Sequence, residues 1–284
     1  MVRVDLHLHT SHSDGRLKPS ELLNMCFQKG LTAIAISDHD TTEGISEAQH
    51  FARPLGIEII PSVELGTRLN GFEIHVLGYF IDLDDVVFQE LLCKYRNARV
   101  IRAKEIVLKL NAIGIPVSWE KVSAISGDGS IGRPHIAYAL IELGYAKDVD
   151  EAFKKYIGYG APGYVARDLL TPHQAVRAIK ENSGIPAIAH PLFTNAKSDR
   201  GDIPHLEDLI ASLCVEGLKG LEVFYGDYTG AQIEKLLKIC RKYDLVPCGG
   251  SDYHAIGTPN EILPGDVGPP PEHLAELKRL NNVS

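Results

Sequence analysis

The amino-acid sequence predicts an α/β protein in which parallel strands close into a barrel, with one helical insertion. Short apolar runs alternate with amphipathic stretches along most of the chain, as strands and helices alternate in βα units. The alternation stops over residues 86–165, where only helical patterns remain. We therefore expect residues 1–85 and 166–284 to form the barrel, and residues 86–165 to form a helical cap.

Seven apolar runs predict the strands of the barrel. They lie near residues 2–9, 33–37, 57–63, 72–80, 185–190, 219–224 and 245–250. The stretches between them carry helix signals. A helix over 20–29 is predicted to end at Gly30, a residue typical of the position after a helix. Thr171 and Gln174 predict a capping box at the start of another helix, and residues 229–243 have apolar side chains at helical spacing.

The insertion is predicted to open with a long helix. Apolar residues repeat at helical spacing over 86–113, and Gly114 and Pro116 then end the pattern. Shorter helical patterns follow at 118–125, 134–143 and 150–156. A segment of this kind between two barrel strands is expected to stand outside the barrel.

Composition limits the classes of function. A formal net charge of −8 argues against a basic surface that holds long nucleic acid, although it allows a small phosphorylated substrate bound through metal ions. The five cysteines form no CxxC pair, which indicates reduced thiols in a cytoplasmic protein. No apolar run approaches the roughly 18 residues of a membrane span, and no signal peptide is expected before the first strand.

Two histidines near the start of the chain are the strongest chemical signal. Residues two apart on a strand point to the same face, so His7 and His9 project together. Asp252 and His254 follow the last predicted strand, almost a chain length away. Imidazole and carboxylate groups presented side by side are typical ligands of borderline divalent metals.

Comparable residues accompany most of the other strands. The carboxyl ends of parallel barrel strands form one face, so these side chains should converge there. One metal takes about four to six ligands, so nine candidates predict two or three divalent ions. The candidate metal ligands are His7, His9, Asp14, His39, Glu64, His75, His190, Asp252 and His254.

These motifs together resemble the PHP (polymerase and histidinol phosphatase) family, with HxH at 7–9, SDHD at 37–40, VEL at 63–65, AHP at 189–191 and SDYH at 251–254. The resemblance implies a distorted (β/α)7 barrel with a centre of Mn, Fe or Zn. Asp14 stands where some members have histidine. The implied ligand sets are His7, His9, Glu64 and Asp252 for one ion, Glu64, His75 and His190 for a second, and Asp14, His39 and His254 for a third.

Residues 130–137 and 158–165 of the insertion resemble the TrpH-like subgroup of PHP phosphoesterases. This resemblance implies a cap over the substrate and two kinds of substrate. One is a nucleotide 3′,5′-bisphosphate, which is hydrolysed to the 5′-nucleotide and phosphate. The other is short 5′-phosphorylated RNA, which is trimmed from its 5′ end.

The implied chemistry assigns roles to three of the ligands. Two adjacent dications lower the pKa of a bridging water toward about 7 and neutralise phosphoryl oxygens. The resulting hydroxide would attack phosphorus. Glu64 would bridge two of the ions, and Asp252 or His254 would accept a proton, so these three residues are the predicted catalytic residues.

Three further residues are candidates for binding the substrate. Arg133 is the first, because a guanidinium binds phosphate through two hydrogen bonds, although a structural ion pair is an alternative. His135, two residues further along the chain, is the second candidate. His12 lies near the metal ligands in sequence and either contacts substrate or belongs to a solvated loop. Asp38 and Asp40 are expected either to orient imidazoles or to cap the next helix.

Three other functions remain in view. A histidinol-phosphate phosphatase would use the same barrel, although the cap weighs against it. Hydrolysis of a C–N bond commonly needs a bridging lysine on the fourth strand, where this chain has His75 and no lysine. A non-catalytic PHP module, as in polymerases, is disfavoured because the full set of candidate ligands is present.

Overall fold

The computed structural model describes residues 3–127, 129–192, 205–258 and 260–281. Within them, seven strands form one sheet whose order follows the chain, so all seven predicted strands are present. The strands are β1 (Val4–Leu8), β2 (Ala33–Ile36), β3 (Glu58–Leu69), β4 (Phe72–Tyr79), β5 (Ile185–Ile188), β6 (Gly220–Tyr225) and β7 (Val246–Gly250).

The first and last strands bring the sheet close to a closed barrel. Leu8 at the end of β1 forms a parallel bridge with Tyr253, which follows β7. The Asp252 N–H donates to the His7 carbonyl at 2.9 Å, and the His9 N–H donates to the Tyr253 carbonyl at 3.1 Å. These bonds fix the two ends of the chain beside each other, as the barrel prediction requires.

The prediction of an all-parallel sheet is wrong at β4, which runs antiparallel to both β3 and β5. Only Asn70 and Gly71 connect β3 to β4, and both have positive φ, 51° and 87°. A two-residue turn of this kind reverses the chain into a hairpin, because no crossover helix is available. The reversal still brings His75 to the ligand end of the barrel, where it pairs in register with Gly66.

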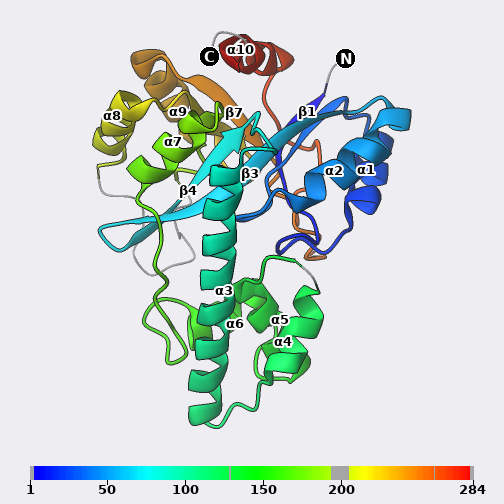
Figure 1. Cartoon of the computed structure of the whole chain (residues 1–284), viewed down its shortest axis with the longest axis vertical. Helices are drawn as coiled ribbons and strands as arrows, with labels where there is room; N and C mark the ends of the chain where they lie inside the picture. The colour runs from blue at the N-terminus through cyan, green and yellow to red at the C-terminus, as the bar shows by residue number, and fades with distance from the viewer. Residues whose placement is uncertain (1–2, 128, 193–204, 259, 282–284) are drawn as a thin grey trace.

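Helices pack around the barrel (Figure 1). One side is covered by α1 (Pro19–Gln28) and α2 (Glu43–Ala52), which a short 3-10 turn, Arg53–Leu55, follows. The other side is covered by α7 (Pro172–Glu181), α8 (Leu206–Glu216) and α9 (Gly230–Tyr243), while α10 (Pro271–Asn281) packs against the interior cluster of the barrel. The predicted capping box of Thr171 and Gln174 and the left-handed Gly30 are both present.

The insertion forms helices with a hydrophobic core of their own. They are α3 (Val86–Ala112), α4 (Trp119–Ser126), α5 (Arg133–Glu142) and α6 (Val149–Ala152), which a π-helical turn, Phe153–Ile157, continues. The predicted long helix is therefore confirmed. Packing divides α3 in two: Phe88 and Leu92 belong to a barrel cluster, whereas Ile106 and Leu110 belong to the core of the insertion. Figure 1 shows α3 running from the sheet into the insertion.

None of the helices in the described ranges has the length and apolar character needed to cross a bilayer. The longest, α3, carries charged side chains along much of its length.

The insertion core should tolerate little change. Leu110→Ala removes a side chain of zero exposure and leaves a cavity, so the free energy of unfolding should fall by about 3 kcal/mol. Leu108→Ala is the matched control on the same helix: its side chain is 70% exposed, and the expected change is below about 0.5 kcal/mol. Urea unfolding of both variants measures the difference. Equal losses would mean that these helices do not enclose a packed core.

Candidate metal centre

All nine predicted ligand residues lie together at one end of the barrel, where each is buried or partly buried. Their donor atoms form three overlapping groups, each with its ligand atoms within 4.8 Å of one another. His9, His39 and Glu64 each belong to two groups, so the groups are neighbours. The groups are His7, His9, Glu64 and Asp252; His9, Asp14, His39 and His254; and His39, Glu64 and His75.

The first group lies where the ends of β1 and β7 meet. Asp252 Oδ1 lies 3.2 Å from His7 Nε2 and 3.0 Å from His9 Nε2. Glu64 Oε2 lies 3.4 Å and 3.3 Å from the same two nitrogens. Two imidazoles and two carboxylates therefore converge on one small volume, in agreement with the set that the family resemblance implied.

Glu64 also reaches the second predicted set. Its Oε1 lies 2.8 Å from His75 Nδ1 and 3.0 Å from His190 Nε2. Its Oε2 lies 3.1 Å from His39 Nδ1. The backbone holds this arrangement, because His39, which follows β2, forms a parallel bridge with Glu64 within β3. Glu64 therefore contacts at least one histidine from each of the three predicted ligand sets.

The third predicted set gathers around Asp14, in the loop after β1. Asp14 Oδ1 lies 3.3 Å from His254 Nε2, and Asp14 Oδ2 lies 3.7 Å from His39 Nε2. His9 joins this group through Nδ1, 3.8 Å from Asp14 Oδ1. The structure thus brings His9 to two groups, which the sequence analysis did not anticipate.

The geometry of the buried ligand atoms suits coordination of metal ions better than hydrogen bonds among the ligands. Asp14 Oδ1, His39 Nδ1 and Asp252 Oδ1 are buried and have no hydrogen-bond partner within the described ranges. Each nevertheless has a potential partner within 3.3 Å. Atoms this close that do not align as hydrogen bonds direct their lone pairs toward shared space, as metal ligands do. The donor set of imidazole nitrogens and carboxylate oxygens suits Mn, Fe or Zn.

Glu222 on β6 orients the His7 imidazole and holds the backbone of His190, and the sequence analysis missed it. His7 Nδ1 lies 3.2 Å from Glu222 Oε1, and the His190 N–H donates to Glu222 Oε2 at 2.6 Å. With its proton on Nδ1, His7 presents a lone pair at Nε2 toward the ligand group. The available sequence signal was a glutamate inside the apolar run Leu221-Glu222-Val223. In the structure, Glu222 is fully buried.

Other side chains around the centre are fixed in similar ways. Tyr225 OH donates to Asp252 Oδ2 at 3.0 Å, and the backbone carbonyl of Asp252 accepts from His254 Nδ1 at 2.7 Å. Asp38 accepts hydrogen bonds from Thr10 and Ser13 and so shapes the loop after β1. Neither Asp38 nor Asp40 caps α2 through its side chain.

Charges in the metal-free centre hold protons on some imidazoles. Burial alone lowers the pKa of His9, but Asp252 and Glu64 outweigh it and raise that pKa to about 10. Burial likewise opposes charge on His75, whose pKa rises to about 10 beside Glu64 and Glu73. Burial dominates at His39 and lowers its pKa to about 3. Metal ions would have to displace the protons of His9 and His75.

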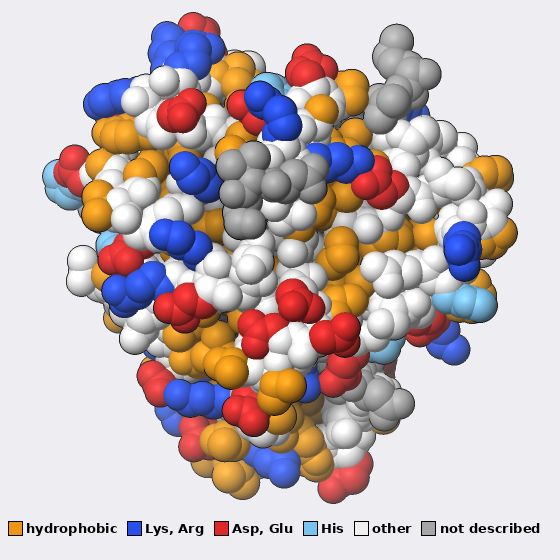
Figure 2. Space-filling model, turned by 45° about the horizontal axis from the view of Figure 1, so that its top comes forward, with side chains coloured by type: hydrophobic (Ala, Val, Ile, Leu, Met, Phe, Trp, Pro, Cys, Tyr) orange, Lys and Arg blue, Asp and Glu red, His pale blue; other side chains and the backbone are white. Residues whose placement is uncertain are grey.

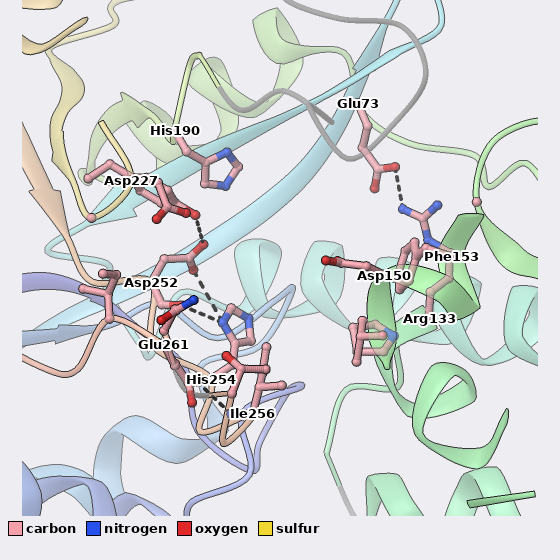
Figure 3. Close-up of a pocket in the computed structure, with 18 of the residues that line it drawn as sticks. Glu73, Arg133, Asp150, Phe153, His190, Asp227, Asp252, His254, Ile256 and Glu261 are labelled. Carbon is pink, nitrogen blue, oxygen red and sulfur yellow. Dashed lines mark hydrogen bonds and ion pairs between the residues drawn. The ribbon is translucent and has the colours of Figure 1, made fainter. Parts of the chain in front are cut away.

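A pocket of about 500 Å³ opens over the centre, between the barrel and the insertion. His190, Asp252 and His254 lie on one side of it, and Arg133 and Phe153 lie on the other (Figure 3). The alternative predicted for Arg133 was a structural ion pair. Such a pair is present, because Arg133 Nη2 lies 3.0 Å from Glu73 Oε2. Arg133 still lines the pocket, so the ion pair does not remove it from reach of a ligand.

The other two predicted substrate contacts have different positions. His135 is buried, and its Nδ1 accepts from the Gly132 N–H at 2.9 Å, which caps the start of α5. His12 points to α2, where its Nε2 lies 3.5 Å from Glu47 Oε2. Neither residue lines the pocket among the residues described. Substrate contact by His135 and His12 therefore stays a prediction.

Comparison with known proteins places the chain in a family. The PHP domain model matches residues 5–161, more than half of the sequence. A 5′-3′ exoribonuclease of Haemophilus influenzae is 34% identical over 252 residues, which cover 89% of this chain and 90% of that protein. A 3′,5′-nucleoside bisphosphate phosphatase of Chromobacterium violaceum is 31% identical over 258 residues, covering 90% and 89%.

A solved structure extends the similarity to the whole fold. A protein of Bifidobacterium adolescentis described as a metal-dependent phosphoesterase superposes with a TM-score of 0.86 at 29% identity, covering 98% of this chain and 96% of that one. The match includes the insertion as well as the barrel, because so little of either chain is left out. The chain therefore belongs to the PHP domain family and is a hydrolase of phosphoric ester bonds.

Proposed function

We propose that this protein hydrolyses a phosphoester of a small nucleotide, either a 3′,5′-bisphosphate or short 5′-phosphorylated RNA, with the help of two or three divalent ions. The observation that carries the proposal is the position of three overlapping ligand groups at the base of a pocket that also holds Arg133. The names of the two relatives, an exoribonuclease and a bisphosphate phosphatase, support these two substrate classes.

The three overlapping ligand groups support a proposal of three ion sites. We assign His7, His9, Glu64 and Asp252 to the first ion and Glu64, His75 and His190 to the second. We assign Asp14, His39 and His254 to the third, as the family resemblance implied. His190 is placed with the second ion because it contacts Glu64 Oε1 beside His75, although its ring nitrogens lie outside the tightest groups. Mn, Fe and Zn are the candidates for the identity of the ions.

The chain itself positions the reacting groups. Divalent ions, when bound, lower the pKa of water and neutralise phosphoryl oxygens. Asp252 and His254 line the pocket, so we assign proton acceptance from the attacking water to one of these two side chains. Tyr225 restrains Asp252 Oδ2 through its hydroxyl, which leaves Oδ1 directed at the histidines. Arg133 is placed to hold phosphoryl oxygens.

The shape and charge of the pocket favour a small substrate. A volume of about 500 Å³ lies within the usual range of small-molecule sites. On the face shown in Figure 2, basic side chains are interspersed with acidic ones and form no continuous band that could hold long nucleic acid. The insertion, residues 86–165, is proposed to act as the cap. The five unpaired cysteines support the proposed cytoplasmic location.

A substrate panel tests the proposed reaction. With Mn²⁺ added, selective release of the 3′-phosphate from adenosine 3′,5′-bisphosphate is expected, with less turnover of AMP and histidinol phosphate. A 5′-phosphorylated RNA trinucleotide tests for nucleotide release. Inorganic phosphate and product masses are the measurements. Histidinol phosphate as the single good substrate would replace the nucleotide proposal with the phosphatase alternative.

Two controls accompany the panel. Glu64→Gln removes the charge that contacts five imidazoles, so phosphate release should fall to background, and a chelator should do the same to the native protein. Glu58→Gln lies on the same strand at an exposed position and should retain activity. Activity that survives Glu64→Gln would contradict the metal assignment.

Glu222→Gln should weaken metal binding rather than abolish the chemistry. The substitution keeps the size of the side chain but removes the negative charge that faces His7 Nδ1 and the His190 N–H. Metal affinity should therefore fall about 10- to 100-fold. Excess Mn²⁺ should then restore much of the turnover. Metal content after dialysis measures the effect, with the exposed Glu234→Gln as control. A lower kcat at saturating metal with unchanged affinity would show that Glu222 acts otherwise.

Metal uptake should depend on pH. His9 and His75 each have a pKa of about 10 in the metal-free centre, so both carry protons at neutral pH and must lose them to bind a metal. Apparent affinity should therefore rise from pH 6 to pH 8 and fall as pH is lowered. Calorimetric Mn²⁺ titrations in two buffers of different ionisation enthalpy count the released protons. Affinity that does not change over this range would refute the prediction.

A further inference from the structure

A buried carboxylate, Asp5, lies at the junction between β1 and β7. The two strands stand at opposite ends of the strand order, and within the described ranges they form no ladder with each other. The backbone bridge across the junction joins Leu8 to Tyr253, both at the ligand end of the barrel. Asp5 precedes Leu8 on β1, and its side chain has zero exposure. The earlier part of the junction therefore depends on contacts other than strand pairing.

The side chain of Asp5 makes four such contacts. Its Oδ1 accepts from the Ser251 N–H at 3.1 Å and from the His7 N–H at 3.2 Å. Its Oδ2 accepts from the Ser251 hydroxyl at 2.7 Å and from the Gly265 N–H at 3.0 Å. All four partners are donors, which matches a carboxylate, whose oxygens only accept. One side chain thus joins β1, the segment after β7 and the segment before α10.

Both of these segments approach β1 too closely for a side chain. A Cβ added at Gly250, the last residue of β7, would lie 2.2 Å from Asp5 Oδ1. A Cβ added at Gly268 would lie 1.9 Å from the carbonyl oxygen of Val4. The backbones on either side are therefore packed directly around the carboxylate.

The segment that Asp5 holds carries a candidate metal ligand. Asp252 follows Ser251 directly, and its N–H donates to the His7 carbonyl at 2.9 Å. Its φ of 52° is left-handed, a conformation that a residue other than glycine keeps only when the surrounding contacts hold it. A shift of Ser251 would therefore move Asp252 away from the two histidines of β1.

We infer that Asp5 is a positioning residue for the metal centre, which places Asp252 opposite His7 and His9. This inference rests on the ion sites of the proposed function and is independent of the substrate. Asp252 belongs to the first ion, so Asp5 acts on that ion. His254 has a separate support, because its carbonyl accepts from the Arg16 N–H at 2.9 Å.

A double-mutant cycle tests this role through metal binding. Asp5→Asn keeps the size of the side chain, but two of the four donors then face an amide nitrogen, which cannot accept. Calorimetric Mn²⁺ affinity should fall about 10- to 100-fold. In an Asp252→Asn background the further loss should stay below about twofold, whereas in a His75→Asn background the full loss should remain. Full losses in both backgrounds, or no loss in the native background, would overturn the inference.

Ser251→Ala is a milder variant, which covers the case that Asp5→Asn does not fold. It removes one of the four hydrogen bonds, so Mn²⁺ affinity should fall about fivefold. Unchanged affinity in this variant would count against the role of Asp5.

Asn182→Ala is the matched control for the loss of a buried hydrogen-bonding side chain. Asn182 is 3% exposed and bonds to Asp82 and Asp85, in a segment without candidate ligands. This variant should melt at a lower temperature than the native protein and keep its Mn²⁺ affinity. A loss of affinity equal to that of Asp5→Asn would mean that general destabilisation explains both.

Hydrogen exchange of the metal-free protein separates this inference from the proposed function. The Asp252 amide, which bonds to the His7 carbonyl, should exchange about tenfold faster in Asp5→Asn than in Asn182→Ala. If the native protein bound no Mn²⁺, the ion sites would fail, and this exchange rate would decide the role of Asp5 by itself. Equal rates in the two variants would overturn the inference.

Discussion

The burial of Glu64 is the constraint on which the rest of the structure depends. This carboxylate is 1% exposed and lies within 3.4 Å of five imidazoles. A charge so deeply buried is tolerated only when groups of opposite charge or metal ions compensate it. The five imidazoles come from β1, β4 and the segments after β1, β2 and β5. The strands must therefore end close together, and the barrel closure between β1 and β7 adds Asp252 to the same volume.

Orientation of the imidazoles is a separate requirement, and groups behind the ligands provide it. Glu222 and the Asp252 carbonyl accept from the Nδ1 atoms of His7 and His254, which leaves Nε2 free to face the centre. Tyr225 restrains Asp252 in turn. The sixth strand supplies no candidate ligand, but through Glu222 it determines how two of the ligands are presented.

The insertion completes the site from above the barrel. One half of α3 packs with the barrel and the other half with the insertion core, so the helix connects the two parts. Arg133 comes from the insertion, whereas Glu73 comes from β4. Positive charge from one part thus meets negative charge from the other at the pocket. The candidate metal ligands belong to the barrel, whereas the pocket above them is lined by residues of both the barrel and the insertion.

The sequence by itself determined the seven strands, the long helix of the insertion and the gathering of nine candidate ligands at one end of the barrel. These features depend on local periodicity and on residues next to strand ends, which a single sequence displays. Only the tertiary structure decided the direction of β4, the capping role of His135, and the position of Glu222. Each of these depends on partners distant in sequence, such as Glu222 with His7, so no local pattern reveals them.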